Sequence, residues 1–198
     1  HSVIENAAGW DAQKIISQLD NRAREILPHG SIIFHFWHKR FIEIAPAIEK
    51  MLNNTNDAYV EIKGSTIIAG RRVNARADRI WDGGVLDIKT GTVPNKKQLM
   101  DGNMPQLPLE AFIMQNNGFP IKTSIKSQTP VLQFLQLKNN NVKLIEYSSS
   151  DADKMIQASV QKISQLFGRY SRDFEEYEYY ETSDTKYKAY DDLARVDD

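Results

Sequence analysis

The segment RADRIWDGGVLDIKTG, residues 76–91, constrains the fold of this chain more than any other stretch. Asp82-Gly83 is a favoured two-residue turn of a β-hairpin, and apolar residues lie on both sides of it. If these two residues form the loop, Trp81 pairs with Gly84, and the two strands run antiparallel. The segment therefore predicts a hairpin whose register is fixed by its own turn.

This register places Asp78 directly opposite Asp87, and cross-strand neighbours have Cβ atoms about 4.5–5.5 Å apart. Side chains alternate along a strand, so Lys89 lies on the same face as Asp87. Two facing carboxylates repel unless something binds them, and Mg²⁺ or Mn²⁺ takes such oxygens. A nearby lysine can orient a metal-bound water or stabilise charge developing on a phosphate. The alternative is a solvent-facing hairpin whose Asp and Lys form ordinary ion pairs.

Composition limits the other possibilities. With 198 residues, 41% of them hydrophobic, the chain can form one domain with an extension. The absence of cysteine excludes disulfides, thiolate metal sites and a cysteine-ligated iron–sulfur cluster. No apolar run approaches the roughly 20 residues of a membrane span, and the first residues do not resemble a signal peptide. A net charge of -1 gives no overall attraction to nucleic acid, so DNA binding must depend on local charge.

Hydrophobic periodicity predicts helices, then strands, a helix, a hairpin and a last helix. This order indicates an α/β or α+β domain with an antiparallel-rich sheet. Pro46 is expected to kink or divide the second helix. Ser150 or Asp151 is expected to cap the last one. The expected helices are 2–26, 31–53, 105–118 and about 151–170; the expected strands are 58–70, 71–81, 85–91, 131–138 and 142–148; residues 93–104 are expected to be a polar loop.

The hairpin, followed by PQLPLEA at residues 105–111, resembles the nuclease core of the RecB family in the PD-(D/E)xK superfamily. Three further segments are similar to the C-terminal nuclease domains of the alphaproteobacterial AddB family: residues 36–50, 91–119 and 190–196. Members of that family are subunits of helicase–nucleases that repair double-strand breaks. The resemblance implies a PD-(D/E)xK, restriction-endonuclease-like α/β core, with a mixed central sheet flanked by helices, over residues 1–172.

The resemblance also implies a role for individual residues. Asp78 and Asp87 match the metal-binding acids, and the carbonyl of Ile88 is a further candidate ligand. Lys89 matches the lysine of the motif. Gln106 matches the glutamine that opens the following helix, and it would position the lysine or the phosphate.

Two positions need separate mention. HSVIE at residues 1–5 resembles the first motif of the family, in which a helix supplies a histidine to the metal; His1 would be that ligand, or else the remnant of an expression tag. The wider family usually has tyrosine four residues after the glutamine, where this chain has Glu110. This departure puts the arrangement of the DNA-facing side in question but leaves the metal site unaffected.

Weaker candidates lie outside the motif. His35 and His38 share a helical face but have no suitably spaced acid, so packing beside Trp37 is favoured over metal binding. Glu61 is a candidate acid behind the metal ligands.

Basic residues surround the hairpin and are the candidate contacts to the DNA backbone. With Lys89 they outnumber the local acids by seven to three, although a run of this kind is also typical of a solvated surface. Phosphate contacts carry no base code, so little sequence preference is expected. The candidate DNA-binding residues are Arg71, Arg72, Arg76, Arg79, Lys96 and Lys97.

The resemblance implies a Mg²⁺- or Mn²⁺-dependent deoxyribonuclease, the exonuclease domain of an AddAB-type enzyme that processes DNA ends for recombinational repair. The expected partners are DNA and an AddA-like helicase–nuclease subunit, with no membrane association and a cytoplasmic, nucleoid-associated location. The alternative is a catalytically weak or inactive nuclease-fold module that binds DNA or braces a helicase partner. Residues 173–198 hold ten acids against three basic residues and many Tyr, and are expected to pack on the domain or on a partner.

Overall fold

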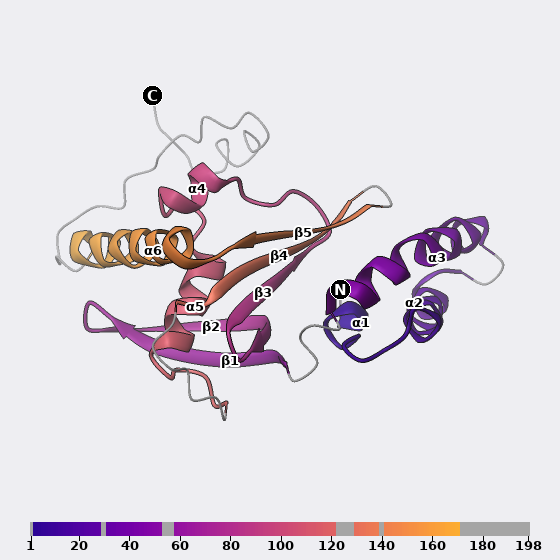
Figure 1. The fold of residues 1–198 in the computed structure, drawn as a ribbon, viewed down its shortest axis with the longest axis horizontal. Coiled ribbons are helices and arrows are strands. Elements are labelled where there is room, and N and C mark those ends of the chain that lie inside the picture. The colour runs from indigo at the N-terminus through magenta and orange to yellow at the C-terminus, as the bar shows by residue number, and fades with distance from the viewer. Residues whose placement is uncertain (1, 29–30, 53–57, 122–128, 139–140, 171–198) are drawn as a thin grey trace, which may run out of the picture.

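A computed structural model describes residues 2–28, 31–52, 58–121, 129–138 and 141–170 (Figure 1). The elements follow the expected order of helices, strands, a helix, a hairpin and a final helix. They are α1 (Ser2–Glu5), α2 (Ala12–Ile26), α3 (Ile32–Leu52), β1 (Tyr59–Ile68), β2 (Arg71–Trp81), β3 (Gly84–Lys89), α4 (Lys96–Met100), α5 (Gln106–Gln115), β4 (Val131–Lys138), β5 (Asn141–Tyr147) and α6 (Ser149–Arg169).

The five strands form one sheet in the order β1-β2-β3-β4-β5. Strands β3 and β4 run parallel, and the other neighbours run antiparallel. The β3-to-β4 connection carries α4 and α5, as a parallel crossover requires. Helices flank the sheet (Figure 1), so the mixed α/β architecture expected from the sequence is confirmed.

Two apolar cores lie on opposite faces of the sheet because side chains alternate along β3. Val85 packs with α5 and α6 in one core. Leu86 and Ile88 pack with α1, α2 and α3 in the other. The alternation leaves Asp87 and Lys89 on the α5 face, where they meet polar residues of that helix.

Each of the two glycines in the hairpin, Gly83 and Gly84, is required for a different local reason. Trp81 pairs with Gly84, so the predicted two-residue turn is confirmed. Gly83 has a φ of 139°, a backbone conformation that L side chains rarely adopt. A Cβ at Gly84 would lie 2.5 Å from the carbonyl oxygen of Val131, so β3 and β4 approach closely only because this side chain is absent.

The predicted helix over residues 2–26 is wrong, because the structure divides it into α1 and α2. Gly9 between them has a φ of 72°. Asp11 then caps α2, its side chain accepting from the backbone N–H of Lys14. A left-handed glycine and an N-cap therefore interrupt a continuous apolar period. Pro46, in contrast, lies inside α3 without dividing it.

Two further boundaries differ from the expectation. The predicted polar loop over 93–104 contains α4, which begins at a capping box in which Asn95 and Gln98 each accept from the other's backbone N–H. The predicted cap at Ser150 or Asp151 is wrong, because both residues lie inside α6, whose N-cap is Ser148. Residues 173–198 lie outside the described residues. Within the described chain, no helix is long and apolar enough to cross a membrane.

Candidate metal and nucleic-acid site

A closed polar network joins β3 to the first turn of α5. The amide nitrogen of Gln106 donates to Asp87 Oδ1 at 2.8 Å, and its amide oxygen accepts from Lys89 Nζ at 3.1 Å. Lys89 Nζ also lies 3.0 Å from Asp87 Oδ1. Because an ammonium group only donates and a carboxylate only accepts, these contacts fix which end of the amide faces each partner.

The two charged groups of this network differ in exposure. Asp87 is 1% exposed, whereas the side chain of Lys89 is 30% exposed. The carboxylate is thus held on the inner side of the network, and the ammonium group reaches its solvent edge. The structure therefore brings together three of the four predicted catalytic residues, Asp87, Lys89 and Gln106.

Asp78, the fourth, lies where β2 and β3 stop pairing. The paired positions run from Trp81–Gly84 to Arg79–Leu86, and Asp78 and Asp87 are the next residues along the two strands. Asp78 Oδ2 accepts a hydrogen bond from the backbone N–H of Ile88 at 2.8 Å. Asp78 is thereby anchored to the strand that carries Asp87 and Lys89.

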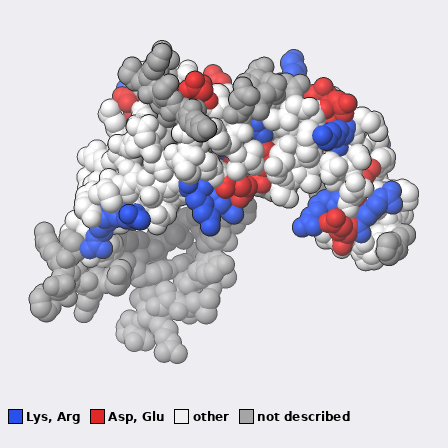
Figure 2. Space-filling view, turned by 90° about the horizontal axis from the view of Figure 1, so that it is seen from below, with Lys and Arg blue, Asp and Glu red and all other residues white. Residues whose placement is uncertain are grey.

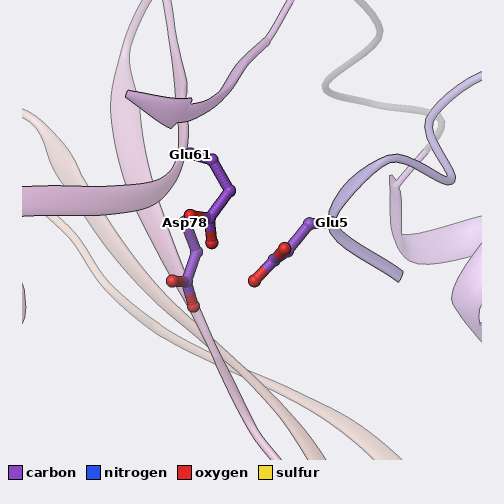
Figure 3. A group of neighbouring side chains, drawn as sticks. All are labelled: Glu5, Glu61 and Asp78. Atoms are coloured by element: carbon purple, nitrogen blue, oxygen red, sulfur yellow. The ribbon is translucent and has the colours of Figure 1, made fainter. Parts of the chain in front are cut away.

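Two further acids lie beside Asp78, and the three carboxylates form one group (Figure 3). Glu5 of α1 and Glu61 of β1 point toward Asp78, and one carboxylate oxygen from each of the three residues lies within 4.8 Å of the others. Glu61 and Asp78 are not paired with each other in the ladder between β1 and β2, although the residues on either side of them are paired. Glu61 has a φ of 52°, a left-handed conformation that costs a non-glycine residue about 1–3 kcal/mol. The sheet is therefore distorted at the point where these acids meet.

Glu110 adds a further carboxyl to the α5 side, one turn after Gln106. It is 1% exposed, and the amide nitrogen of Gln106 lies 3.4 Å from its Oε1. Burial, followed by the charges of Asp87 and Asp78, raises the pKa of Glu110 to about 8. Among the described residues, Glu110 Oε2 has no hydrogen-bond partner. A pKa of about 8 keeps this carboxyl mostly protonated at neutral pH, chiefly because it is buried.

This donor set fits a hard divalent cation. Carboxylate oxygens are the ligands that Mg²⁺ and Mn²⁺ prefer. Asp78 belongs to the group with Glu5 and Glu61, and its carboxylate is hydrogen-bonded to the strand that carries Asp87. The charges of Asp87 and Asp78, which add to burial in raising the pKa of Glu110, are what a bound cation would offset. His1, the predicted histidine ligand, lies outside the described residues.

The predicted DNA-binding residues differ in exposure. Arg79 is fully buried, and its guanidinium donates to the backbone carbonyl of Glu5 at 2.5 Å. Burial also lowers the pKa of Arg79. The predicted DNA contact by Arg79 is therefore wrong, because the arginine holds α1 against β2 instead.

The remaining basic candidates are more accessible. Arg71 and Arg72 are exposed, and Lys97 is exposed on α4. Arg76 pairs with Glu61 at 2.8 Å, and Lys96 pairs with an aspartate of α6 at 2.6 Å. Figure 2, a view from below, shows Lys and Arg side chains in separate groups, several of them with Asp or Glu side chains beside them. A phosphate contact by Arg76 would have to compete with the ion pair to Glu61.

Sequence reasoning missed Glu5, which the structure places in the acidic group. The signal was present in HSVIE, because Glu5 is the acidic residue of the segment that resembles the first motif of the family. The two histidines of α3 do not join a metal site: His38 Nδ1 lies 2.7 Å from Asp20 Oδ2, and His35 packs against Phe34.

No family model matches the chain. Protein RT0391 of Rickettsia typhi (strain ATCC VR-144 / Wilmington), described as uncharacterized, is 37% identical over 98 residues, which are 45% of this chain and 11% of that protein. An uncharacterized protein of Rickettsia bellii (strain RML369-C) is 32% identical over 145 residues, 63% of this chain and 17% of that protein. An uncharacterized protein of Rickettsia felis (strain ATCC VR-1525 / URRWXCal2) is 40% identical over 78 residues, which are 35% of this chain and 9% of that protein.

The chain thus spans less than a fifth of the length of these relatives, since it covers at most 17% of them. Among solved structures, the crystal structure of SSO0001 is 11% identical, with a TM-score of 0.35, over 78% of this chain and 85% of that one. A likeness this distant assigns neither a fold family nor an activity.

Proposed function

We propose that this chain is a PD-(D/E)xK nuclease domain that hydrolyses DNA phosphodiester bonds with the help of a divalent metal ion. The observation that carries the proposal is the arrangement of one acid and one lysine on β3, joined by Gln106, beside a second acid anchored from β2. The mixed sheet with helices on both faces is the scaffold that such a core requires. Sequence resemblance to the RecB family supports the same assignment.

In this proposal Asp78 and Asp87 hold the metal ion, with the carbonyl of Ile88 as a further ligand. When bound, a Mg²⁺ or Mn²⁺ ion lowers the pKa of a coordinated water and neutralises charge on the scissile phosphate. Lys89 orients the attacking water or offsets the negative charge that develops on the phosphate. Gln106 keeps the ammonium group in place, because its amide contacts both Lys89 and Asp87.

The wider role follows from the same resemblance. The domain would be the exonuclease part of an AddB-like subunit that trims DNA ends during double-strand-break repair by recombination. DNA and an AddA-like helicase–nuclease subunit would be its partners, in the cytoplasm and at the nucleoid. The relatives are much longer than this chain, so there is room for further parts of such a protein outside it.

One observation favours a second candidate function, a nuclease-fold module that braces a partner. Ile32, Ile33 and Phe36 on α3 are 83%, 51% and 65% exposed, an apolar face that a free domain would not need. The bracing role and catalysis are compatible. The second candidate function differs from the first only in that the domain would have no nuclease activity.

The test is Mn²⁺-dependent cleavage of end-labelled linear DNA. The wild-type chain should release labelled products only when the metal is present. Asp87→Ala and Lys89→Met should each lose at least 100-fold in rate, an estimate from the size of single catalytic electrostatic contributions, roughly 10²–10³. Lys154→Met, at an exposed position of α6, is a matched control for the loss of one positive charge. Equal rates in wild type and both site variants would reject the proposal.

A further inference from the structure

The arm formed by α2 and α3 projects away from the sheet (Figure 1), and a cleft of about 870 Å³ lies where it meets α1, β1 and β2. The walls are largely apolar. Leu19, Ile26, Trp37 and Phe41 of the arm line it. Its size and apolar lining are those of a site for an organic group, not for a metal ion alone.

The cleft is continuous with the candidate metal site. Glu5 and Glu61, the two acids grouped with Asp78, also line the cleft. A group seated in the cleft would therefore lie next to whatever is bound at Asp78. If the scissile phosphate lies at the acids, as the proposed function requires, the cleft receives the nucleoside beside it.

The lining suits a nucleobase. Trp37 is 36% exposed and lines the cleft, so its indole has surface available to a planar ring. Phe41 lies behind it, with a ring centroid 6.1 Å away, and the guanidinium of Arg40 lies 4.9 Å from the indole centroid. Bases stack on aromatic side chains of this kind with little regard to sequence, because every base has a π face.

Cationic groups on the walls complement the charge of the backbone that such a base carries. Arg22 of α2 and Arg76 of β2 both line the cleft, and their side chains are 58% and 61% exposed. Each pairs with a glutamate in the structure, so a phosphate would exchange with that partner. An apolar ligand without negative charge would not use these two groups.

We propose that this cleft is a base-binding subsite, in which Trp37 stacks on one unpaired base next to the phosphate held at the acids. The inference rests on the proposed nuclease function. A base engaged in a duplex is stacked and paired, so only a base that has left the helix can enter. Trp37 is then a residue that determines the structural class of substrate.

The test is equilibrium binding of a fluorescein-labelled oligothymidylate to the Lys89→Met background in Mg²⁺, where cleavage should be slowed at least about 100-fold. Trp37→Ala should weaken binding about tenfold, within the range that stacking on one base contributes. Trp37→Phe should retain most of the affinity. Phe36→Ala is the matched control, because Phe36 neighbours Trp37 on α3, is 65% exposed and does not line the cleft.

A second experiment changes the oligonucleotide instead of the protein, so its result does not depend on whether a protein variant folds. Replacing one thymidine by an abasic residue, moved along the oligonucleotide, should weaken binding to the Lys89→Met protein at one position about tenfold and have no effect once Trp37 is also replaced. An abasic effect that persists in Trp37→Ala, or unchanged binding by Trp37→Ala, overturns the inference. Failure of the proposed function is separate: it is the absence of metal-dependent cleavage by the wild-type chain.

Discussion

Glu110 should make the domain less stable as the pH rises. The raised pKa means that the folded state keeps its proton up to about pH 8, whereas the unfolded chain releases it near pH 4.5. Between these values the folded state binds more protons than the unfolded state, so the free energy of unfolding falls as pH increases. The sign is opposite to that of a carboxylate held by an ion pair.

The magnitude follows from the same two values. The interval from pH 4.5 to about 8 corresponds to about 5 kcal/mol, at about 1.36 kcal/mol per pH unit. This is a large share of the roughly 5–15 kcal/mol by which a domain is stable. Glu110→Gln keeps the shape and the oxygen that faces Gln106 but cannot ionise, so it should remove the decline.

The assay is urea unfolding of wild type and Glu110→Gln at intervals from pH 5 to pH 9, without metal. The two proteins should differ little at pH 5, and the variant should be more stable by several kcal/mol at pH 8. Saturating Mg²⁺ should shrink the difference, because it neutralises Asp87 and Asp78, two causes of the raised pKa. Parallel stability profiles for the two proteins would refute the reasoning.

Three other predictions concern the metal site, the hairpin and the contacts to DNA. Mg²⁺ should raise the melting temperature of the wild-type chain, and Asp87→Asn should abolish that response, as differential scanning fluorimetry would record. Gly84→Ala should destabilise the fold by about 1–3 kcal/mol in urea titrations, since its Cβ would meet the Val131 carbonyl oxygen, whereas Gly91→Ala meets nothing within 4 Å and should be neutral. Arg72→Ala should reduce the salt dependence of DNA binding by about one phosphate contact, measured by anisotropy across a salt series; an unchanged slope would exclude that contact.

The hairpin was predictable because its determinants are local. An Asp-Gly turn sets the register of the two strands within four residues, and alternation then puts Asp87 and Lys89 on one face. Gln106 was predictable from resemblance alone. Its contacts to both residues depend on where α5 docks, which no short segment of the sequence encodes.

The surroundings of Asp78 could not be predicted in the same way. Its meeting with Glu61 depends on a distorted pair of strands, and its meeting with Glu5 depends on how α1 packs over the sheet. The burial of Arg79 has the same cause, since the arginine bonds to the end of α1. The surroundings of Asp78 and the burial of Arg79 therefore depend on the long-range packing of α1, which the sequence of β2 alone does not reveal.

The central claim is that a divalent cation binds between Asp78 and Asp87, and anomalous X-ray diffraction from crystals containing Mn²⁺ tests it most directly. The account predicts a manganese peak within about 2.0–2.6 Å of oxygens from both aspartates, which disappears in Asp87→Ala. A peak held by Glu5 and Glu61 without Asp87, or no peak at millimolar Mn²⁺, would contradict it.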